Sequence, residues 1–297
     1  MSDCKVVIYR NLKIILCIFG IICLAYLLLC MCRIFVCEQY IIPTHSMTPT
    51  LIPGDRIWVN KLIFGGRIYK EFDFNMDAPL KSWRMPRLRV IQPNDVLVFN
   101  APHGYDRGKI EFKINYVYAK RCIGTPGDTI SIQNCRFYNN NYDKVLGDTI
   151  QQNFLESIPD SLIPSSVMRV FPADEQHKDW TIKNMGPLYV PQKGDSICID
   201  KMNWGLYRLA IEYETRSELS FLNDQVLLDG RPLSYYKFTE NYYYFCGDNV
   251  ADSRDSRYLG FVPEEFIVGV VGIIPYSRDR ASNKIRWDRI CKSVKVQ

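Results

Sequence analysis

The 297-residue chain has little of several features that would point to other classes of protein. It has only 3 histidines, and its 11 cysteines show no CxxC pair or other metal-site spacing, so the sequence predicts no metal. Its 37 basic and 32 acidic residues leave a net charge of +5, without the basic stripe that a nucleic-acid partner needs. No internal repeat is visible. The 47% of apolar residues are enough for the core of one globular unit.

One long uncharged segment is present, at residues 14–32. As a helix it is roughly 28 Å long, enough to cross the hydrocarbon core of a membrane. Three basic residues precede it, whereas Arg33 and Glu38 after it nearly cancel, so the positive-inside rule predicts a cytoplasmic N-terminus and an extracytoplasmic remainder at the inner membrane. A cleaved signal peptide is the alternative, but its apolar region would be shorter and would end at an Ala-x-Ala site.

Most of the cysteines belong to this N-terminal part of the chain. Six lie in or beside the apolar segment, where they act as small lipid-compatible residues. No disulfide is predicted for the other five, which are Cys122, Cys135, Cys198, Cys246 and Cys291.

From residue 38 onward the pattern indicates strands. Residues 56–60 alternate, 95–99 form a short buried run, and 110–123 are long, β-branched and aromatic, with Gly-Asp and Pro-Gly-Asp turns between the runs. Outside the anchor, one short helix is predicted near residues 153–158. We therefore predict a mostly β fold whose antiparallel-sheet domain is interrupted by a second β region and follows one transmembrane helix.

The predicted organisation follows from these patterns and from the charge of the last residues. The C-terminal tail carries seven basic and two acidic residues, and we expect it to be solvated or in contact with anionic headgroups. The predicted parts are a cytoplasmic N-terminus at 1–13, a transmembrane helix at 14–32, the main β domain at 33–134 and 246–277, the inserted β-rich region at 135–245 and the basic tail at 278–297.

Residues 41–51 place one serine in an irregular loop. An apolar lead-in ends at Pro43, and Pro49 closes the run after Ser46. Proline cannot continue a helix and has no ladder donor, so we expect a strand followed by a loop that displays Ser46. An ordinary turn has the same composition. Ser46 lies only about fourteen residues beyond the anchor, and therefore within roughly 50 Å of the membrane surface.

Residues 118–128 place a lysine inside an apolar strand. Strand side chains alternate, so Lys120 and Arg121 face opposite ways. If Tyr118, Lys120 and Cys122 face inward, burial lowers the lysine pKa from its usual value near 10.4. A neutral lysine can accept a proton from a serine hydroxyl. Taken alone, a lysine in a strand is more commonly a solvated surface or edge residue.

Residues 247–263 are polar, charge-balanced and bounded by glycine at 247 and 260. Burial of this segment would be costly unless its charges pair with one another. The simpler interpretation is a charged surface turn.

In this order, the three segments resemble the bacterial type I signal peptidases, the leader peptidases of the Ser/Lys class. The resemblance also includes Gly54-Asp55 and covers residues 38–65, 93–130 and 243–273, but not the insert. It implies a membrane-anchored serine endopeptidase that removes signal peptides from secreted preproteins at the membrane lipid surface. Such an enzyme needs no metal or cofactor.

The resemblance also implies a role for each matching residue. Ser46 is the nucleophile and Lys120 the general base. Thr44 and the Ser46 backbone N–H form the oxyanion hole, and Ser253 orients the lysine. The other matches are the substrate pockets (Tyr40, Ile42, Met47), the ion-paired support (Arg121, Asp248, Asp255, Arg257) and a lipid-facing surface or strand end (Leu62, Ile63, Phe64).

The chain departs from the family pattern at two places. Val250-Ala251-Asp252 replaces the frequent Arg-Asp-Asn, and His45 stands where a small residue is usual. His45 raises the alternative of a Ser–His hydrolase, with His103 or His177 as other bases, although the ring of a residue next to Ser46 would point away from it.

Three further classes fit parts of the pattern. Repressor-type autoproteases share Ser/Lys chemistry but carry a DNA-binding domain where this chain has its apolar segment. An anchored β-rich binding module would place Ser46 far from an exposed Lys120. An inactive paralogue would keep the geometry without the activity.

Overall fold

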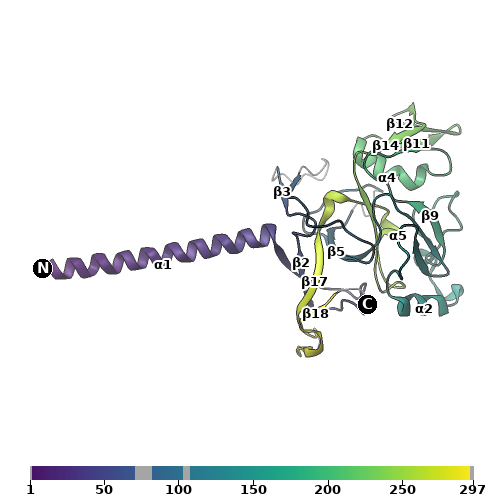
Figure 1. Ribbon diagram of the computed structural model, residues 1–297. Coiled ribbons are helices and arrows are strands. Elements are labelled where there is room, and N and C mark those ends of the chain that lie inside the picture. The colour runs from purple at the N-terminus through teal and green to yellow at the C-terminus, as the bar shows by residue number, and fades with distance from the viewer. Residues whose placement is uncertain (1, 71–81, 103–107, 295–297) are drawn as a thin grey trace.

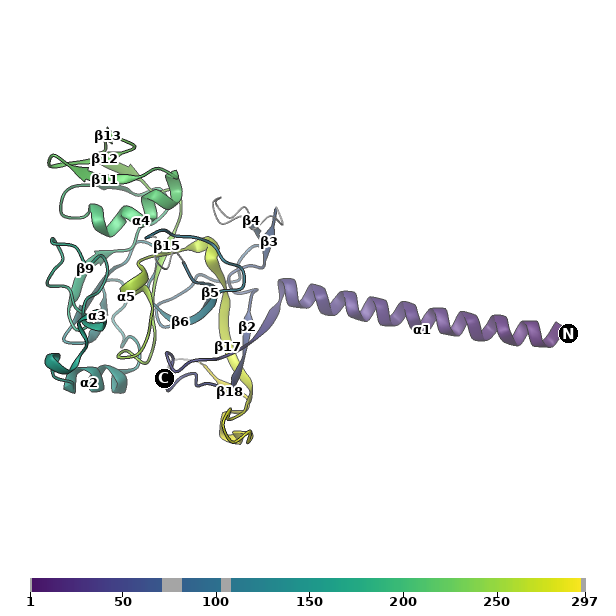
Figure 2. The same ribbon diagram turned by 180° about the vertical axis from the view of Figure 1, so that it is seen from behind.

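A computed structural model describes residues 2–70, 82–102 and 108–294, and its N-terminal helix stands apart from the rest (Figure 1). Helix α1 (Ser2–Phe35) contains a 26-residue segment, Arg10–Phe35, that is long and apolar enough to cross a membrane. The most apolar part of this segment is not buried against the rest of the protein, and both views show it projecting from the globular part (Figure 2). The predicted single apolar helix is confirmed, and it extends beyond both ends of 14–32.

The end of α1 is fixed to the first two strands of the globular part. Strand β1 (Cys37–Ile41) follows α1 almost directly and pairs antiparallel with β2 (Asp55–Asn60). Just after β2, the Lys61 ammonium donates to the Arg33 carbonyl at 2.9 Å and lies 2.7 Å from the Glu38 carboxylate. The strand that leads to Ser46 is therefore tied to the end of the anchor helix.

Within the described ranges, eight strands form one antiparallel sheet that organises the fold. Its order is β1-β2-β17-β5-β6-β15-β16, and β18 pairs with β17. This confirms the predicted mostly β fold with an antiparallel sheet. The remaining strands of this sheet are β5 (Val96–Asn100), β6 (Val117–Gly124), β15 (Tyr242–Cys246), β16 (Val262–Pro263), β17 (Ile267–Ser277) and β18 (Lys292–Ser293).

The strand predicted at 110–123 forms only from Val117. Before it, the Asn100 side-chain amide donates to the carbonyls of Lys113 and Ile114 at 3.0 Å each, which holds that segment in a turn. Ile110 and Phe112 are buried from this loop. Their apolar character reflects core packing rather than strand pairing.

The region after β6 adds smaller sheets and helices. Helix α2 (Thr149–Ser157) overlaps the helix predicted near 153–158, whereas α4 (Trp204–Thr215) was not predicted. This segment belongs to the region predicted to be β-rich at 135–245, but the buried residues of α4 recur at helical spacing. The strands here are β7 (Thr129–Gln133), β8 (Arg136–Asn139), β9 (Met185–Tyr189), β10 (Ser196–Cys198), β11 (Leu219–Leu222), β12 (Gln225–Leu228), β13 (Arg231–Pro232) and β14 (Tyr235–Lys237).

Short elements complete the fold. Strands β3 (Arg67–Tyr69) and β4 (Ser82–Arg84) form a separate hairpin, and Phe64 just before it is buried in the core, so the lipid-facing interpretation of Phe64 is wrong. The cysteine side chains that the structure describes are all free thiols. The remaining helical turns are η1 (Asp160–Leu162), α3 (Ser165–Met168), α5 (Ser256–Leu259), η2 (Glu264–Phe266) and η3 (Trp287–Arg289).

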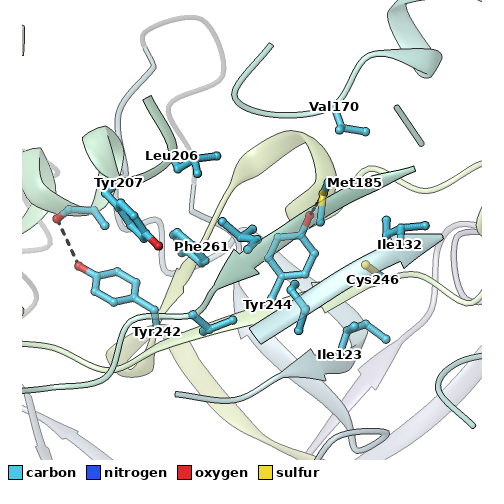
Figure 3. Packing of buried hydrophobic residues seen from close by; sticks show 14 of the residues in the cluster. Ile123, Ile132, Val170, Met185, Leu206, Tyr207, Tyr242, Tyr244, Cys246 and Phe261 are labelled. Atoms are coloured by element: carbon cyan, nitrogen blue, oxygen red, sulfur yellow. Dashed lines mark hydrogen bonds between the residues drawn. The ribbon is translucent and has the colours of Figure 1, made fainter. Parts of the chain in front are cut away.

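Strand β15 joins the large sheet to the core of the insert. Its residues alternate between the two: Tyr242 and Tyr244 pack in the insert core, whereas Tyr243 and Phe245 pack on the other side. Figure 3 shows Tyr242 and Tyr244 beside Phe261, and the Tyr242 hydroxyl donates to the carbonyl of Ala210 in α4 at 3.2 Å. A strand buried on both faces reads as a continuous apolar run, as this one does.

Most residues of 278–293 are exposed, as expected of a solvated tail, but Arg289 instead packs against the loop that precedes β2. Arg289 is 6% exposed, and its guanidinium donates to both oxygens of the buried Asp55 carboxylate and to the Thr50 carbonyl. The Arg286 guanidinium donates to the Pro53 carbonyl at 2.9 Å. These arginines find buried acceptors near Ser46, which is why they leave solvent.

Arg289→Ala is expected to destabilise the protein by about 3–5 kcal/mol, because it leaves the buried Asp55 carboxylate without its counter-charge. The free energy of unfolding of the full chain in detergent, from urea titration, measures this loss. Lys284→Ala removes an exposed charge from the same segment and should change stability by less than about 0.5 kcal/mol. Equal effects of the two substitutions would contradict the role given to Arg289.

Candidate active site

The structure brings Ser46 and Lys120 together from two distant parts of the chain. Ser46 lies in the loop between β1 and β2, and Lys120 lies in β6, in the middle of the sheet. The Lys120 Nζ donates to the Ser46 Oγ at 2.5 Å. This contact has the geometry that a serine nucleophile and its base require, and it distinguishes the site from a surface lysine and an unrelated turn.

The environment of Lys120 favours its neutral form. The side chain is 3% exposed, and this burial lowers its pKa to about 8, although the Asp255 carboxylate opposes the shift. The Tyr118 ring centre lies 5.6 Å from Nζ. At neutral pH a useful fraction of Lys120 is therefore able to accept a proton.

Two buried ion pairs occupy the carboxylates that lie near Lys120. The Arg121 guanidinium binds both Asp248 oxygens at 2.6 Å each. The Arg257 guanidinium binds the Asp255 oxygens at 2.9 and 2.7 Å and is 0% exposed. Burial alone would raise the Asp255 pKa, but Arg257 lowers it below its usual value. Each aspartate therefore forms its ion pair with an arginine and not with Lys120.

The loop that carries Ser46 is held from several sides. The Asn249 backbone N–H donates to the Ser46 carbonyl at 3.2 Å, and its side chain donates to the His45 carbonyl at 3.3 Å. Four residues beyond Ser46, Thr50 accepts Arg121 on its hydroxyl and Arg289 on its carbonyl. Asn249 was not predicted as a site residue, because only the fold places its backbone against residue 46.

Ser253 and Thr44 also lie at this site. The Ser253 hydroxyl donates to Asp255 at 2.7 Å, so its role in orienting Lys120 stays a prediction. A Cβ on Gly247 would collide with the Ser253 side chain and the Ser46 carbonyl, which shows how closely these two residues approach. The Thr44 Oγ1 lies 3.4 Å from the Ser46 Oγ.

A cavity of about 440 Å³ opens over Ser46 and Lys120. Its lining consists of residues 42–47 and 116–120 together with Asp252 and Arg254. Of the predicted pocket residues, Ile42 and Met47 line this cavity, whereas Tyr40 does not.

Tyrosines account for the main difference between the predicted and the observed lining. The Tyr40 hydroxyl donates to Glu38 at 2.9 Å instead of facing the cavity. Tyr116 and Tyr118 line the cavity, with their hydroxyls 2.9 Å apart. Strand alternation had placed Tyr118 on the same face as Lys120, but neither tyrosine was predicted as a pocket residue.

The histidines do not replace Lys120 at Ser46. His45 is exposed and lines the cavity, but the base that bonds to the Ser46 hydroxyl is the lysine. His177 lies in the insert, where its ring contacts Asp174 at 2.7 Å and Trp180. His103 lies outside the described residues. In the part of the chain that the structure describes, no group of three or more His, Cys, Asp or Glu residues is placed to hold a metal ion.

The chain is similar to several known proteins. The family described as "Signal peptidase, peptidase S26" matches residues 13–276. Signal peptidase I of Buchnera aphidicola subsp. Schizaphis graminum (strain Sg) is 28% identical over 265 residues, which cover 85% of this chain and 72% of that protein. Signal peptidase I of Helicobacter pylori (strain ATCC 700392 / 26695) is 25% identical over 282 residues, which cover 88% of this chain and 86% of that protein. A solved signal peptidase I from Enterococcus faecalis V583 is 18% identical, covering 61% of this chain and 97% of that one, with a TM-score of 0.29.

The family match includes both the Ser46 loop and the strand that carries Lys120, and it spans most of the chain. The protein therefore belongs to the signal peptidase (peptidase S26) family.

Proposed function

We propose that this protein is a serine endopeptidase, anchored in the membrane by α1, that removes signal peptides from translocated preproteins. The observation that carries the proposal is the 2.5 Å contact between the Ser46 hydroxyl and a buried Lys120 amine. Family membership supports it, because signal peptidases act on preproteins. The three basic residues before the apolar segment at 14–32 favour a cytoplasmic N-terminus, with the site on the outer side of the membrane.

The chemistry proceeds by acyl transfer. Neutral Lys120 takes the proton from the Ser46 hydroxyl as its oxygen attacks the carbonyl carbon of the residue before the scissile bond. The carbon–nitrogen bond then breaks, the new amine takes the proton from Lys120, and an ester to Ser46 remains. Lys120 next removes a proton from water, which attacks the ester; the bond to the Ser46 oxygen breaks, this oxygen takes the proton back from Lys120, and the signal peptide leaves as a carboxylic acid.

The transition state carries negative charge on the former carbonyl oxygen. In the proposed mechanism, the Thr44 hydroxyl and the Ser46 backbone N–H donate to this oxygen. Ser253 keeps the lysine amine directed at Ser46, and the Arg121–Asp248 and Arg257–Asp255 pairs support the surrounding loops.

The substrate binds as an extended strand between the two walls of the cavity. Strand β1 is at one end of the sheet order, so the edge that does not face β2 is able to accept a further strand. The apolar side chains of Ile42 and Met47 receive small side chains at positions −1 and −3 of the cleavage site.

Ser46→Ala and Lys120→Met are each expected to reduce cleavage of a preprotein with an Ala-x-Ala site by at least about 10³-fold, since each removes one half of the reacting pair. Cleavage is followed by gel shift with the full chain in lipid vesicles. Lys144→Met, which alters an exposed lysine outside the cavity, should retain wild-type activity. Substantial activity in either catalytic variant would exclude the mechanism.

The rate is expected to increase with pH through about 8. Lys120 acts as a base only when neutral, so below its pKa the neutral fraction falls, to about one tenth at pH 7 and about one hundredth at pH 6. The pH profile of kcat/KM measures this dependence. A profile that instead rises near 6.5 would indicate a histidine base.

Gly247→Ala is expected to reduce kcat by roughly a hundredfold, because the added methyl group forces apart the Ser46 carbonyl and the Ser253 side chain. Gly272→Ala is the matched control, since its added methyl group meets no atom closer than 4.0 Å. Circular dichroism and steady-state kinetics of both variants test the prediction. It is wrong if Gly247→Ala folds and cleaves as fast as the wild type.

A further inference from the structure

A second cavity, of about 370 Å³, borders the first one, and apart from Ser253 its lining residues have no part in the chemistry described above. The two cavities share Asp252 and Arg254 in their linings, and Ser253 between them lines the second one. The opposite wall of the second cavity comes from the insert, from Ser166 and Val167 of α3. A peptide that crosses Ser46 is therefore able to continue from one cavity into the other.

The insert is held firmly against this part of the catalytic loop. The Tyr258 hydroxyl donates to the Val167 carbonyl at 2.7 Å, and the Phe171 N–H donates to the Arg257 carbonyl at 2.7 Å. Val167, Ala251 and Tyr258 pack against the insert core. The second cavity thus has a fixed wall beside residues that support Lys120.

The direction of the substrate decides which of its residues reach the second cavity. In the proposed function, the side chains before the scissile bond occupy the part of the first cavity lined by residues 42–44 and 116–119. Ser46 and Lys120 follow these residues in their two segments, and Asp252 and Arg254 line both this cavity and the second one. We therefore expect the chain after the scissile bond to leave toward Asp252 and Arg254.

We propose that the second cavity binds the first residues of the mature protein, those that follow the scissile bond. This proposal rests on the proposed function and adds a binding subsite to it. Its walls are apolar at Val167, Ala251 and Tyr258 and charged at Asp252 and Arg254, which suits an extended peptide with small or medium side chains. The insert thereby takes part in substrate selection.

A substitution that fills the second cavity tests the proposal. Ser166 is exposed and lines the cavity, so Ser166→Trp is expected to block it. Ser165→Trp adds the same side chain one residue earlier, at an exposed position outside the lining. Two substrates are compared with the full chain in vesicles: a preprotein with a long mature part, and a signal-peptide segment whose scissile bond joins it to a small chromogenic amine.

Ser166→Trp is expected to lower kcat/KM for the preprotein by about tenfold or more, while its cleavage of the chromogenic substrate stays unchanged. Ser165→Trp is expected to cleave both substrates as the wild type does. Unchanged preprotein cleavage by Ser166→Trp would overturn the proposal. An equal loss for both substrates would overturn it as well, since the effect would then come from the catalytic centre. If the wild type cleaves neither substrate, the proposed function itself fails.

A second measurement does not depend on how well the tryptophan variant folds. In the Ser46→Ala protein, a photoreactive phenylalanine analogue at position 166 is irradiated with bound preprotein, and the attachment site is mapped by mass spectrometry. Attachment within the first residues of the mature part is expected. Attachment only within the signal peptide, or none to bound preprotein, would overturn the proposal.

Discussion

The site depends on one buried amine that has no carboxylate of its own. Burial strongly favours the neutral form of Lys120, and a free carboxylate beside it would cancel that effect by attracting a proton to the amine. Asp255 and Asp248 lie near enough to act on Lys120, but each is bound by an arginine on two oxygens. The strongest polar contact left to Lys120 is the Ser46 hydroxyl. The arginine pairs are therefore part of what makes the lysine a base.

The same network also positions the nucleophile. Arg121 binds Asp248 and reaches the hydroxyl of Thr50, while Arg289 from the C-terminal segment binds Asp55 and the Thr50 carbonyl. Ser46 lies on a loop rather than in a strand, so hydrogen bonds of this kind must fix its position. Arg289, which the sequence suggested to be a solvated residue of the tail, thus supports the loop that carries Ser46.

The insert and the anchor connect this centre to its surroundings. The Lys61 contacts fix β1 to the end of α1, which places the cavity near the membrane if α1 spans it. On the other side, β15 shares its two faces between the sheet and the insert, and α3 lies against the loop after Gly247. A preprotein bound as proposed would therefore contact the site between the anchor helix on one side and the insert on the other.

The sequence by itself determined the apolar helix, the antiparallel sheet and the choice of Ser46 and Lys120 as a candidate pair, because these depend on local apolar patterns and on short motifs. It did not determine that α4 is a helix, that the strand carrying Lys120 begins only at Val117, or that Tyr40 turns away from the cavity. The start of the Lys120 strand depends on the Asn100 amide of another strand, and the direction of Tyr40 depends on a local hydrogen bond to the Glu38 carboxylate that no apolar pattern predicts. Only the tertiary structure decided that the basic C-terminal segment supports the Ser46 loop and that the insert borders the catalytic cavity, since both follow from burial of charges and side chains between distant segments.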